Sequence, residues 1–234
     1  MSHPVQLDAR DYYLSPRWDN LIQWLSYWHQ IERVLTYLSP GAQLLEIGPG
    51  NGTVSTYLRA RGYHVVTLDH DPALSPAVIG DAMTLPFVSE SFDGVICCEV
   101  LEHLPFEDAL DTLQDIHRII RQVCVVSVPY QSLYLSICAL PTYARILDPA
   151  FRLLKLRPQE PARLMLRLPM FFRSQPVTPL HHWEMGLKRF SRRKVESAFT
   201  ALGFTIRSRA SHLLYGYHEY YVLEKSRGVS ACKE

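Results

Sequence analysis

Apolar runs alternate with helix-like stretches and polar turns through the middle of this chain. Some runs have the length of buried strands, whereas other stretches place apolar residues three and four positions apart, as amphipathic helices do. Strands that alternate with helices predict a parallel sheet with helices on both faces. The predicted strands are 43–47, 64–68, 94–98 and 123–128, and the predicted helices are 54–62 and 106–121.

A further helix precedes the first strand. Residues 15–39 are rich in tryptophan and tyrosine, and their apolar positions follow helical spacing. The sequence Ser39-Pro40-Gly41 ends this helix, because proline and glycine both interrupt helical backbone. We therefore expect an N-terminal helical cover in residues 1–40.

Composition narrows the class of protein. The chain has 234 residues, of which 47% are apolar and 20% charged, so it can bury a sizeable core. Its formal net charge of +1 indicates neither a nucleic-acid partner nor an acidic one. Five cysteines without C-x-x-C spacing argue against a disulfide framework and against a cysteine-bound zinc. Because the first residues lack the pattern of a secretory signal, we expect a cytoplasmic protein.

The sequence EIGPGNG, residues 46–52, lies between the first predicted strand and a predicted helix. Glycine has no Cβ, so at three alternate positions the backbone can approach a ligand or adopt a positive φ. The helix that begins near Thr53 points free backbone N–H groups toward the same loop. We expect a polar or anionic ligand there, although three glycines can also make only a tight turn.

Acidic residues after the glycine loop indicate a nucleoside ligand. Asp69 ends the second strand, where a carboxylate can accept hydrogen bonds from two ribose hydroxyls. Nicotinamide-dependent enzymes share this feature, but their fingerprint requires glycine or alanine where this chain has Thr53. The pair Gly80-Asp81 adds a second acid, which the dinucleotide-binding fold does not require. A nicotinamide oxidoreductase is therefore the less favoured alternative.

Four motifs together resemble the class I S-adenosylmethionine-dependent methyltransferases: EIGPGNG, LDHDP, GDAMTLPF and FDGVICCEVLEHL, in that family's order and at its usual spacing. The resemblance covers about 43–130, and 203–224 resemble the family's last two strands. It implies an α/β, Rossmann-like, doubly wound and mostly parallel seven-stranded sheet. We expect the core in 41–130 and 191–234, with an inserted helical lid or substrate region in 131–190.

The resemblance also implies S-adenosylmethionine as the cofactor. The glycine loop would line the methionine part with Glu46 beneath it, and the segment from Cys98 would close over that end. Asp69 would hold the ribose, and Asp81 would accept a hydrogen bond from the adenine amino group, with Met83 against the ring. The implied cofactor-binding residues are Glu46, Gly48, Gly50, Gly52, Asp69, His70, Asp81, Ala82, Met83 and Cys98.

Catalytic residues are harder to name, because transfer of an activated methyl chiefly requires an aligned nucleophile and a general base is optional. His103 follows the fourth strand and could take a proton at neutral pH, or it could pack beside the next helix. His182, in the sequence HHWE, could contact the substrate from a lid. The HHWE spacing matches no metal signature, so we expect no metal. Tyr130 ends the fifth strand and would face the acceptor or pack beneath the lid.

The segment after the fifth strand departs from a minimal methyltransferase and should determine the substrate. Residues 123–144 carry no charge, but their prolines and the sheet's need for 123–128 argue against a membrane span. Residues 145–173 contain seven basic and two acidic residues among many apolar ones. This mixture fits an amphipathic cover or a peripheral contact with an anionic membrane. It fits an RNA groove less well, because aromatic residues are not interleaved for stacking.

The sequence thus predicts an enzyme that moves a methyl group from S-adenosylmethionine to a small or lipid-like acceptor, with oxygen slightly favoured. We expect no nucleic-acid partner. The main alternative is a non-catalytic binding protein or membrane-surface adaptor that keeps the cofactor fold. The intact glycines and acids argue against that alternative, because a protein without cofactor would be free to lose them.

Overall fold

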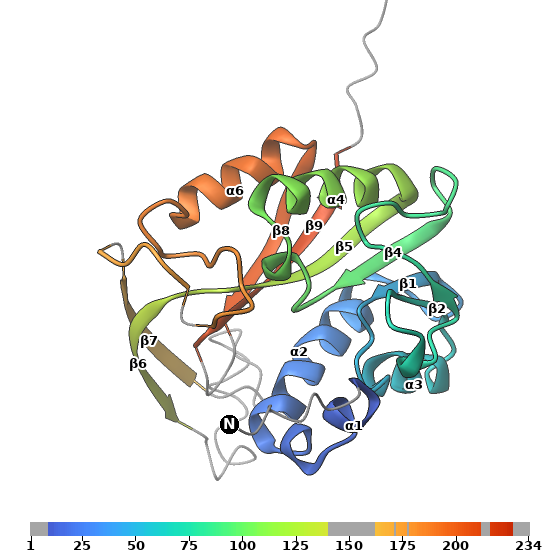
Figure 1. Ribbon diagram of the computed structural model, residues 1–234, viewed down its shortest axis with the longest axis horizontal. Helices are drawn as coiled ribbons and strands as arrows, with labels where there is room; N and C mark the ends of the chain where they lie inside the picture. The colour runs from blue at the N-terminus through green and yellow to red at the C-terminus, as the bar shows by residue number, and fades with distance from the viewer. Residues whose placement is uncertain (1–8, 140–161, 171, 177, 212–215, 227–234) are drawn as a thin grey trace, which may run out of the picture.

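A seven-stranded sheet forms the centre of the protein (Figure 1). The structure is a computed structural model that describes residues 9–139, 162–170, 172–176, 178–211 and 216–226. The strands are β1 (Gln43–Ile47), β2 (His64–Asp69), β3 (Val78–Ile79), β4 (Phe92–Cys97), β5 (Ile120–Pro129), β8 (Phe204–Ser211) and β9 (His218–Lys225). Their order is β3-β2-β1-β4-β5-β9-β8, and only the pairs formed by β9 are antiparallel. The mostly parallel, doubly wound sheet is therefore confirmed.

Helices cover both faces of this sheet (Figure 1). One face carries α4 (Phe106–Ile119) and α6 (Arg192–Ala201), and the other carries α2 (Leu21–Tyr37) and α3 (Thr53–Ala60). The neighbouring residues Leu44 and Leu45 belong to opposite apolar clusters, because successive strand side chains point to opposite faces. Within the described residues there are four further short helices: α1 (Ala9–Tyr13) and the 3₁₀ helices η1 (Pro16–Trp18), η2 (Pro72–Leu74) and η3 (Leu101–His103).

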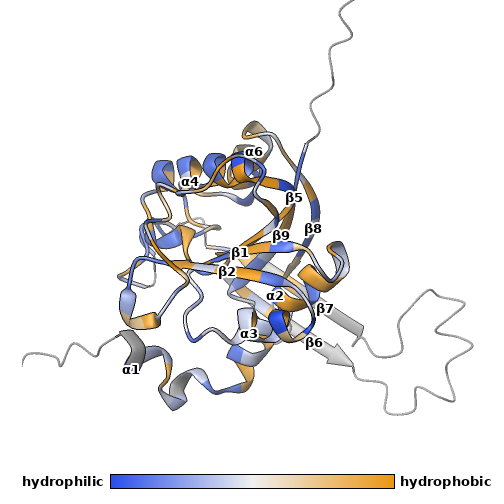
Figure 2. Cartoon of the chain, turned by 90° about the vertical axis from the view of Figure 1, so that its right-hand side faces the viewer, coloured by the Kyte–Doolittle hydropathy of each residue, from blue (hydrophilic) through white to orange (hydrophobic). Residues whose placement is uncertain are grey.

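The helix α4 shows how the sequence pattern sets these layers. Its residues Ala109, Leu113 and Ile116 are three or four positions apart and are buried against the sheet. Acidic residues occupy its first turn and Arg118 its last, which suits the helix dipole. Figure 2 shows hydrophilic residues on the outer side of α4, away from the orange strands. The predicted helix 106–121 is thus observed, ending two residues earlier.

The predicted inserted helical lid is wrong where the structure describes it. Residues 132–139 and 162–169 form the strands β6 (Ser132–Ala139) and β7 (Ala162–Pro169), which pair antiparallel as a separate two-stranded sheet. Figure 1 places this pair at one side of the main sheet. The physical reason is a period of two in the apolar residues of these strands, which suits a strand and not a helix.

Exposed leucines face one another across this pair. Leu133 pairs with Leu168, and Leu135 pairs with Leu166. All four are exposed, Leu133 and Leu168 each to 68%. We call these four residues the apolar ladder. The basic residues expected to contact a membrane lie mostly in 145–161, outside the described residues. Of the helices that the structure describes, none is both long enough and apolar enough to cross a membrane.

Candidate active site

A cavity of about 470 Å³ opens at the carboxyl ends of β1, β2 and β4, where parallel sheets bind their ligands. We call it the Asp69 cavity. Seven of the ten predicted cofactor-binding residues line it: Gly48, Gly50, Asp69, His70, Asp81, Ala82 and Met83. The structure therefore brings together residues from three separate sequence motifs.

The glycine loop lies against the segment that follows β4. Gly48 has φ of +69°, and a Cβ atom there would lie 2.6 Å from Cγ2 of Val100. Its backbone N–H donates a 2.9 Å hydrogen bond to the carbonyl of Leu68, which ties the loop to β2. Glycine is therefore required at this position for both conformation and space. Gly52 also has a positive φ, but it caps α3 and lies outside the lining of the Asp69 cavity.

Two carboxylates line this cavity, that of Asp69 buried and that of Asp81 exposed. Asp69 is buried to 7% exposure, and its Oδ1 accepts a 3.0 Å hydrogen bond from the backbone N–H of Asp71. The exposed ring of His70 lies 3.2 Å from the same oxygen. Asp81 is exposed, and its Oδ1 accepts from the N–H of Met83, which shapes the turn around the cavity rim.

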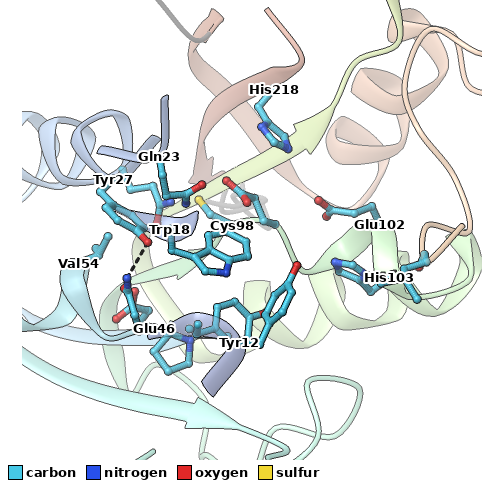
Figure 3. A pocket seen from close by; sticks show the side chains of 18 of the residues that line it. Tyr12, Trp18, Gln23, Tyr27, Glu46, Val54, Cys98, Glu102, His103 and His218 are labelled. Carbon is cyan, nitrogen blue, oxygen red and sulfur yellow. Dashed lines mark hydrogen bonds between the residues drawn. The ribbon is translucent and has the colours of Figure 1, made fainter. Parts of the chain in front are cut away.

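A second cavity, of about 340 Å³, adjoins the first (Figure 3). Tyr12, Trp18 and Tyr27 from the N-terminal helices line one part of it, and we call it the aromatic cavity. Glu102 and His103 of η3 line another part. The two cavities share five residues: Tyr13, Gly48, Gly50, Glu99 and His103. We call this shared wall the junction.

The remaining two predicted cofactor residues line the aromatic cavity. Glu46 is the next-to-last residue of β1 and is buried at 3% exposure, and its Oε2 has no hydrogen-bond partner among the described residues. Burial raises the pKa of Glu46 to about 7. Cys98 is buried beside it, and burial raises the pKa of its thiol well above the ordinary value. A buried thiol of this kind is a packing group and a poor nucleophile at neutral pH.

Glu99 stands at the junction in an unusual backbone conformation. Its φ is +57°, in the left-handed region that disfavours residues with a Cβ. Ser127 accepts a hydrogen bond from its backbone N–H, and Ser26 donates one to its carboxylate. These contacts hold the carboxylate between β4 and α2. Backbone strain that surrounding contacts maintain in this way is typical of functional sites.

His103 is brought to the junction, as expected from its place after β4. Its Nδ1 lies 3.3 Å from the carbonyl oxygen of Leu180, and its ring packs edge-on against His181 at 4.9 Å between ring centroids. Partial burial lowers the pKa of His103, and the neighbouring His181 lowers it further. His103 is therefore held in its neutral form more readily than a free histidine.

His181 lines the aromatic cavity, whereas the predicted His182 does not. The side chain of His182 is exposed, and its backbone N–H donates to the carbonyl of Glu102. The reason is a bend at His182, after which Trp183 enters the core, where its Nε1 donates to the carbonyl of Leu101. His181 instead bonds to the buried carboxylate of Glu184 through Nδ1 at 2.8 Å.

Tyr130 packs in the core and lines neither cavity. It is 4% exposed and forms an isolated bridge with Met185, and the guanidinium of Arg192 lies 4.6 Å from its ring centroid. The second of the two roles predicted for Tyr130, packing beneath a neighbouring segment, is the one that its position favours.

Tyr13 is a site residue that the sequence did not indicate. It ends α1, and its ring would be 3.4 Å from a Cβ placed on Gly50. It therefore covers the glycine loop and lines both cavities. No sequence motif indicates its role, because its position depends on how the N-terminal segment folds over the sheet. Glu99 and His181, in contrast, belong to the quoted sequences EVLEHL and HHWE.

Comparison with known proteins relates this chain to a family. Residues 45–126 match the family model of a methyltransferase domain. No curated protein matches the sequence significantly. Sheet order, glycine loop and acids define a Rossmann-like domain that holds a nucleoside cofactor. The family match identifies residues 45–126 as a methyltransferase domain, which supports the predicted class I S-adenosylmethionine-dependent methyltransferase and S-adenosylmethionine as its cofactor.

Solved structures share the fold at low sequence identity. The N-methyltransferase NodS of Bradyrhizobium japonicum WM9 is 13% identical with a TM-score of 0.57, over 90% of this chain and 99% of that one. Magnesium protoporphyrin IX methyltransferase of Synechocystis PCC 6803, with bound S-adenosylmethionine, is 15% identical with a TM-score of 0.55, over 96% and 100%. The PH0226 protein of Pyrococcus horikoshii OT3 is 17% identical with a TM-score of 0.54, over 92% and 99%.

Proposed function

We propose that this enzyme transfers the methyl group of S-adenosylmethionine to a hydroxyl oxygen of a small, ring-containing acceptor in the aromatic cavity. The observation that carries this proposal is the junction. Because the two cavities share Gly48, Gly50 and Glu99, a cofactor in the Asp69 cavity with its methionine end at the junction presents its methyl to the aromatic cavity.

The residues of the Asp69 cavity suit the cofactor's parts. Gly48 and Gly50 line the cavity without side chains and suit the methionine part, and the buried Asp69 suits the two ribose hydroxyls. Asp81, with Met83 beside it, suits the adenine. The buried Oε2 of Glu46, which has no partner among the described residues, offers an acceptor to the ammonium group at the methionine end.

When bound, S-adenosylmethionine supplies a methyl whose bond to sulfur breaks as the acceptor oxygen bonds to the carbon, the electron pair remaining on sulfur. The chain's residues must then orient the acceptor in line and exclude water, which can contribute roughly 7–11 kcal/mol. Tyr12, Trp18 and Tyr27 offer flat apolar walls to a ring. Glu99 and His103 offer polar atoms at the junction, where the hydroxyl of the acceptor must lie and lose its proton.

The apolar ladder supports a second candidate, a lipid-like acceptor taken from a membrane surface. Four exposed leucines face one another on β6 and β7 and form an apolar strip. The sequence that joins these two strands contains Arg145, Arg152, Lys155 and Arg157. If this candidate is correct, anionic vesicles will retain the protein, and the double variant Leu133→Ser with Leu168→Ser will be released. Failure of vesicles to retain the wild-type chain would leave only the small acceptor.

Calorimetric titration with S-adenosylmethionine, S-adenosylhomocysteine and NADH tests the cofactor part of the proposal. We expect micromolar binding of both adenosyl ligands and none of NADH. Asp69→Ala should weaken adenosyl binding by about ten- to a hundredfold, which corresponds to roughly 1.5–3 kcal/mol for lost hydrogen bonds to a charged group.

Asp111→Ala is the matched control, because it removes the same charge from the exposed outer side of α4. Its affinities should equal those of the wild type. Unchanged binding by Asp69→Ala would contradict the ribose assignment. A panel of hydroxylated and amino-substituted ring compounds then tests the acceptor, with S-adenosylhomocysteine release as the measurement. Turnover of the amines alone would contradict the choice of oxygen.

A further inference from the structure

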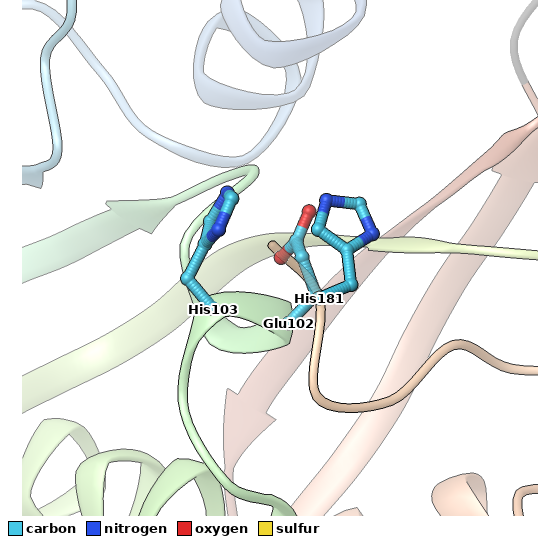
Figure 4. A group of neighbouring side chains, drawn as sticks. All are labelled: Glu102, His103 and His181. Atoms are coloured by element: carbon cyan, nitrogen blue, oxygen red, sulfur yellow. The ribbon is translucent and has the colours of Figure 1, made fainter. Parts of the chain in front are cut away.

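Three potential metal ligands converge on the wall of the aromatic cavity (Figure 4). Glu102 and His103 come from η3, and His181 comes from the segment before Trp183. One carboxylate oxygen and one nitrogen from each ring all lie within 4.8 Å of one another. Atoms that bind one zinc at about 2.0–2.2 Å are roughly 3–4 Å apart. Small changes in side-chain torsion therefore suffice to bring the three groups to a common ion.

Glu102 supplies an independent sign that a ligand belongs here. Its side chain is 1% exposed, and its Oε2 has no hydrogen-bond partner within the part of the chain that the structure describes. Figure 4 shows the carboxylate between the two imidazole rings. A buried polar atom without a partner costs about 1–3 kcal/mol, and more when it is charged. A cation at this position removes that cost.

The two histidines are oriented as metal ligands usually are. Nδ1 of His181 bonds to Glu184, which is fully buried and also accepts from the hydroxyl of Tyr217 at 2.7 Å. Nδ1 of His103 lies 3.3 Å from the carbonyl oxygen of Leu180. An acceptor at Nδ1 places the ring proton there and leaves Nε2 with a free lone pair. Carboxylate and carbonyl partners of this kind are the common second contact of metal-bound histidine.

The charge balance of the site also favours a cation. The carboxylates of Glu46, Glu99 and Glu102 all line the aromatic cavity. Among the described residues that line the aromatic cavity, none is lysine or arginine. These three carboxylates therefore share the cavity without a basic side chain from its described lining to balance them, and a divalent ion would offset their negative charge.

We propose that Glu102, His103 and His181 bind a divalent transition-metal ion. Two imidazoles with one carboxylate suit zinc, manganese or iron(II) better than magnesium or calcium, which prefer oxygen ligands. Three protein ligands leave a coordination position open toward the cavity. The sequence did not predict this site, because its third ligand comes from a distant segment and no short spacing joins the three.

The role of the ion rests on the proposed function. An ion at this wall can bind the acceptor's oxygen and lower the pKa of its hydroxyl, so that the attacking oxygen is already deprotonated at neutral pH. The hydroxyl proton then leaves to solvent before the new carbon–oxygen bond forms. In this arrangement His103 holds the ion and does not take the proton.

Metal titration of the tag-free, metal-stripped chain tests the site directly. We expect one equivalent of Zn²⁺ to bind by calorimetry, and one equivalent of Co²⁺ to give visible absorption bands typical of nitrogen and oxygen ligands. Magnesium chloride should give no binding. His181→Ala and Glu102→Gln should each weaken Zn²⁺ binding by at least about a hundredfold, more than the 10- to 100-fold typical of second-contact residues.

His182→Ala is the matched control, because it removes the adjacent, exposed imidazole and should leave Zn²⁺ affinity unchanged. Absence of Zn²⁺ and Co²⁺ binding by the wild type would overturn the proposal. So would a loss in His182→Ala equal to that in His181→Ala. S-adenosylhomocysteine titration of the same samples verifies that each variant is folded. Metal binding without adenosyl binding would contradict the proposed function and leave the metal site standing.

Discussion

The Asp69 cavity and the aromatic cavity meet at one junction but are assembled differently. The Asp69 cavity is lined chiefly by the loops that directly follow β1, β2 and β4, so the sheet itself fixes its walls. Besides the glycine loop, the aromatic cavity takes its walls from the N-terminal helices, η3, the 178–181 segment and the start of β9. The proposed cofactor side therefore depends on the sheet and its loops, whereas the proposed acceptor side also depends on how several segments from outside the sheet's parallel core pack together.

The largest expected effect concerns a substitution in the glycine loop of the Asp69 cavity. Gly48→Ala places a Cβ 2.6 Å from Cγ2 of Val100 at a residue with φ of +69°. Left-handed backbone alone costs roughly 1–2 kcal/mol, and the collision displaces the segment that borders both cavities. We expect the free energy of unfolding to fall by roughly 2–4 kcal/mol. Adenosyl affinity should fall by at least about a hundredfold. Denaturant titration and calorimetry measure the two effects.

Gly41→Ala separates the two causes. Gly41 also has a positive φ, of +91°, but a Cβ there would have no atom within 4 Å. Gly41→Ala should lower the free energy of unfolding only by the cost of the left-handed backbone, and it should leave the affinity for the adenosyl ligands unchanged. If both variants bind the cofactor equally well, close packing of the glycine loop is not what the cofactor requires.

A second, smaller effect concerns Glu46 on the floor of the aromatic cavity. Burial raises its pKa from 4.5 to about 7 in the folded chain. The folded state therefore binds the proton more tightly than the unfolded state, and the stability from this group is lost as pH rises from about 5 to about 8. The change in free energy of unfolding over that window is on the order of 2 kcal/mol.

Glu46→Gln should remove this part of the pH dependence. As pH rises from 5 to 8, the free energy of unfolding of the variant should increase relative to that of the wild type. Denaturant titration of the cofactor-free chain at the two pH values measures this difference. Glu107→Gln, which changes an exposed acid at the start of α4, should follow the wild type at both values. Parallel curves for Glu46→Gln and the wild type would show that the pKa of Glu46 is not raised.

The contrast between the cavities also explains what the sequence could predict. Residues such as Asp69 and Asp81 stand directly after apolar runs, so strand periodicity locates them at the carboxyl edge of the sheet. The aromatic cavity has no such signal. Whether His181 or His182 faces inward depends on the course of a loop that bends at His182 and is held by the buried Trp183.

The inserted region shows a second limit. Its many apolar residues suggested a helical lid, yet the parts that the structure describes are the strands β6 and β7. Short apolar runs are ambiguous between helix and strand when no partner is known. Pairing of Ser132 with Pro169 joins residues far apart in the sequence, and such a contact is invisible to a local pattern.

The smallest expected effect tests the boundary between the cavities. Tyr13 covers Gly50 and lines both cavities, whereas the neighbouring Tyr12 lines only the aromatic cavity. Tyr13→Ala removes an aromatic contact from the cofactor side and should weaken adenosyl binding by about 5- to 10-fold, roughly 1 kcal/mol. Tyr12→Ala removes the same ring from the acceptor side and should change adenosyl affinity less than about twofold. Equal losses in both variants would mean that the N-terminal segment acts on the two cavities as one unit, since only a shared displacement of α1 affects a site that Tyr12 does not line.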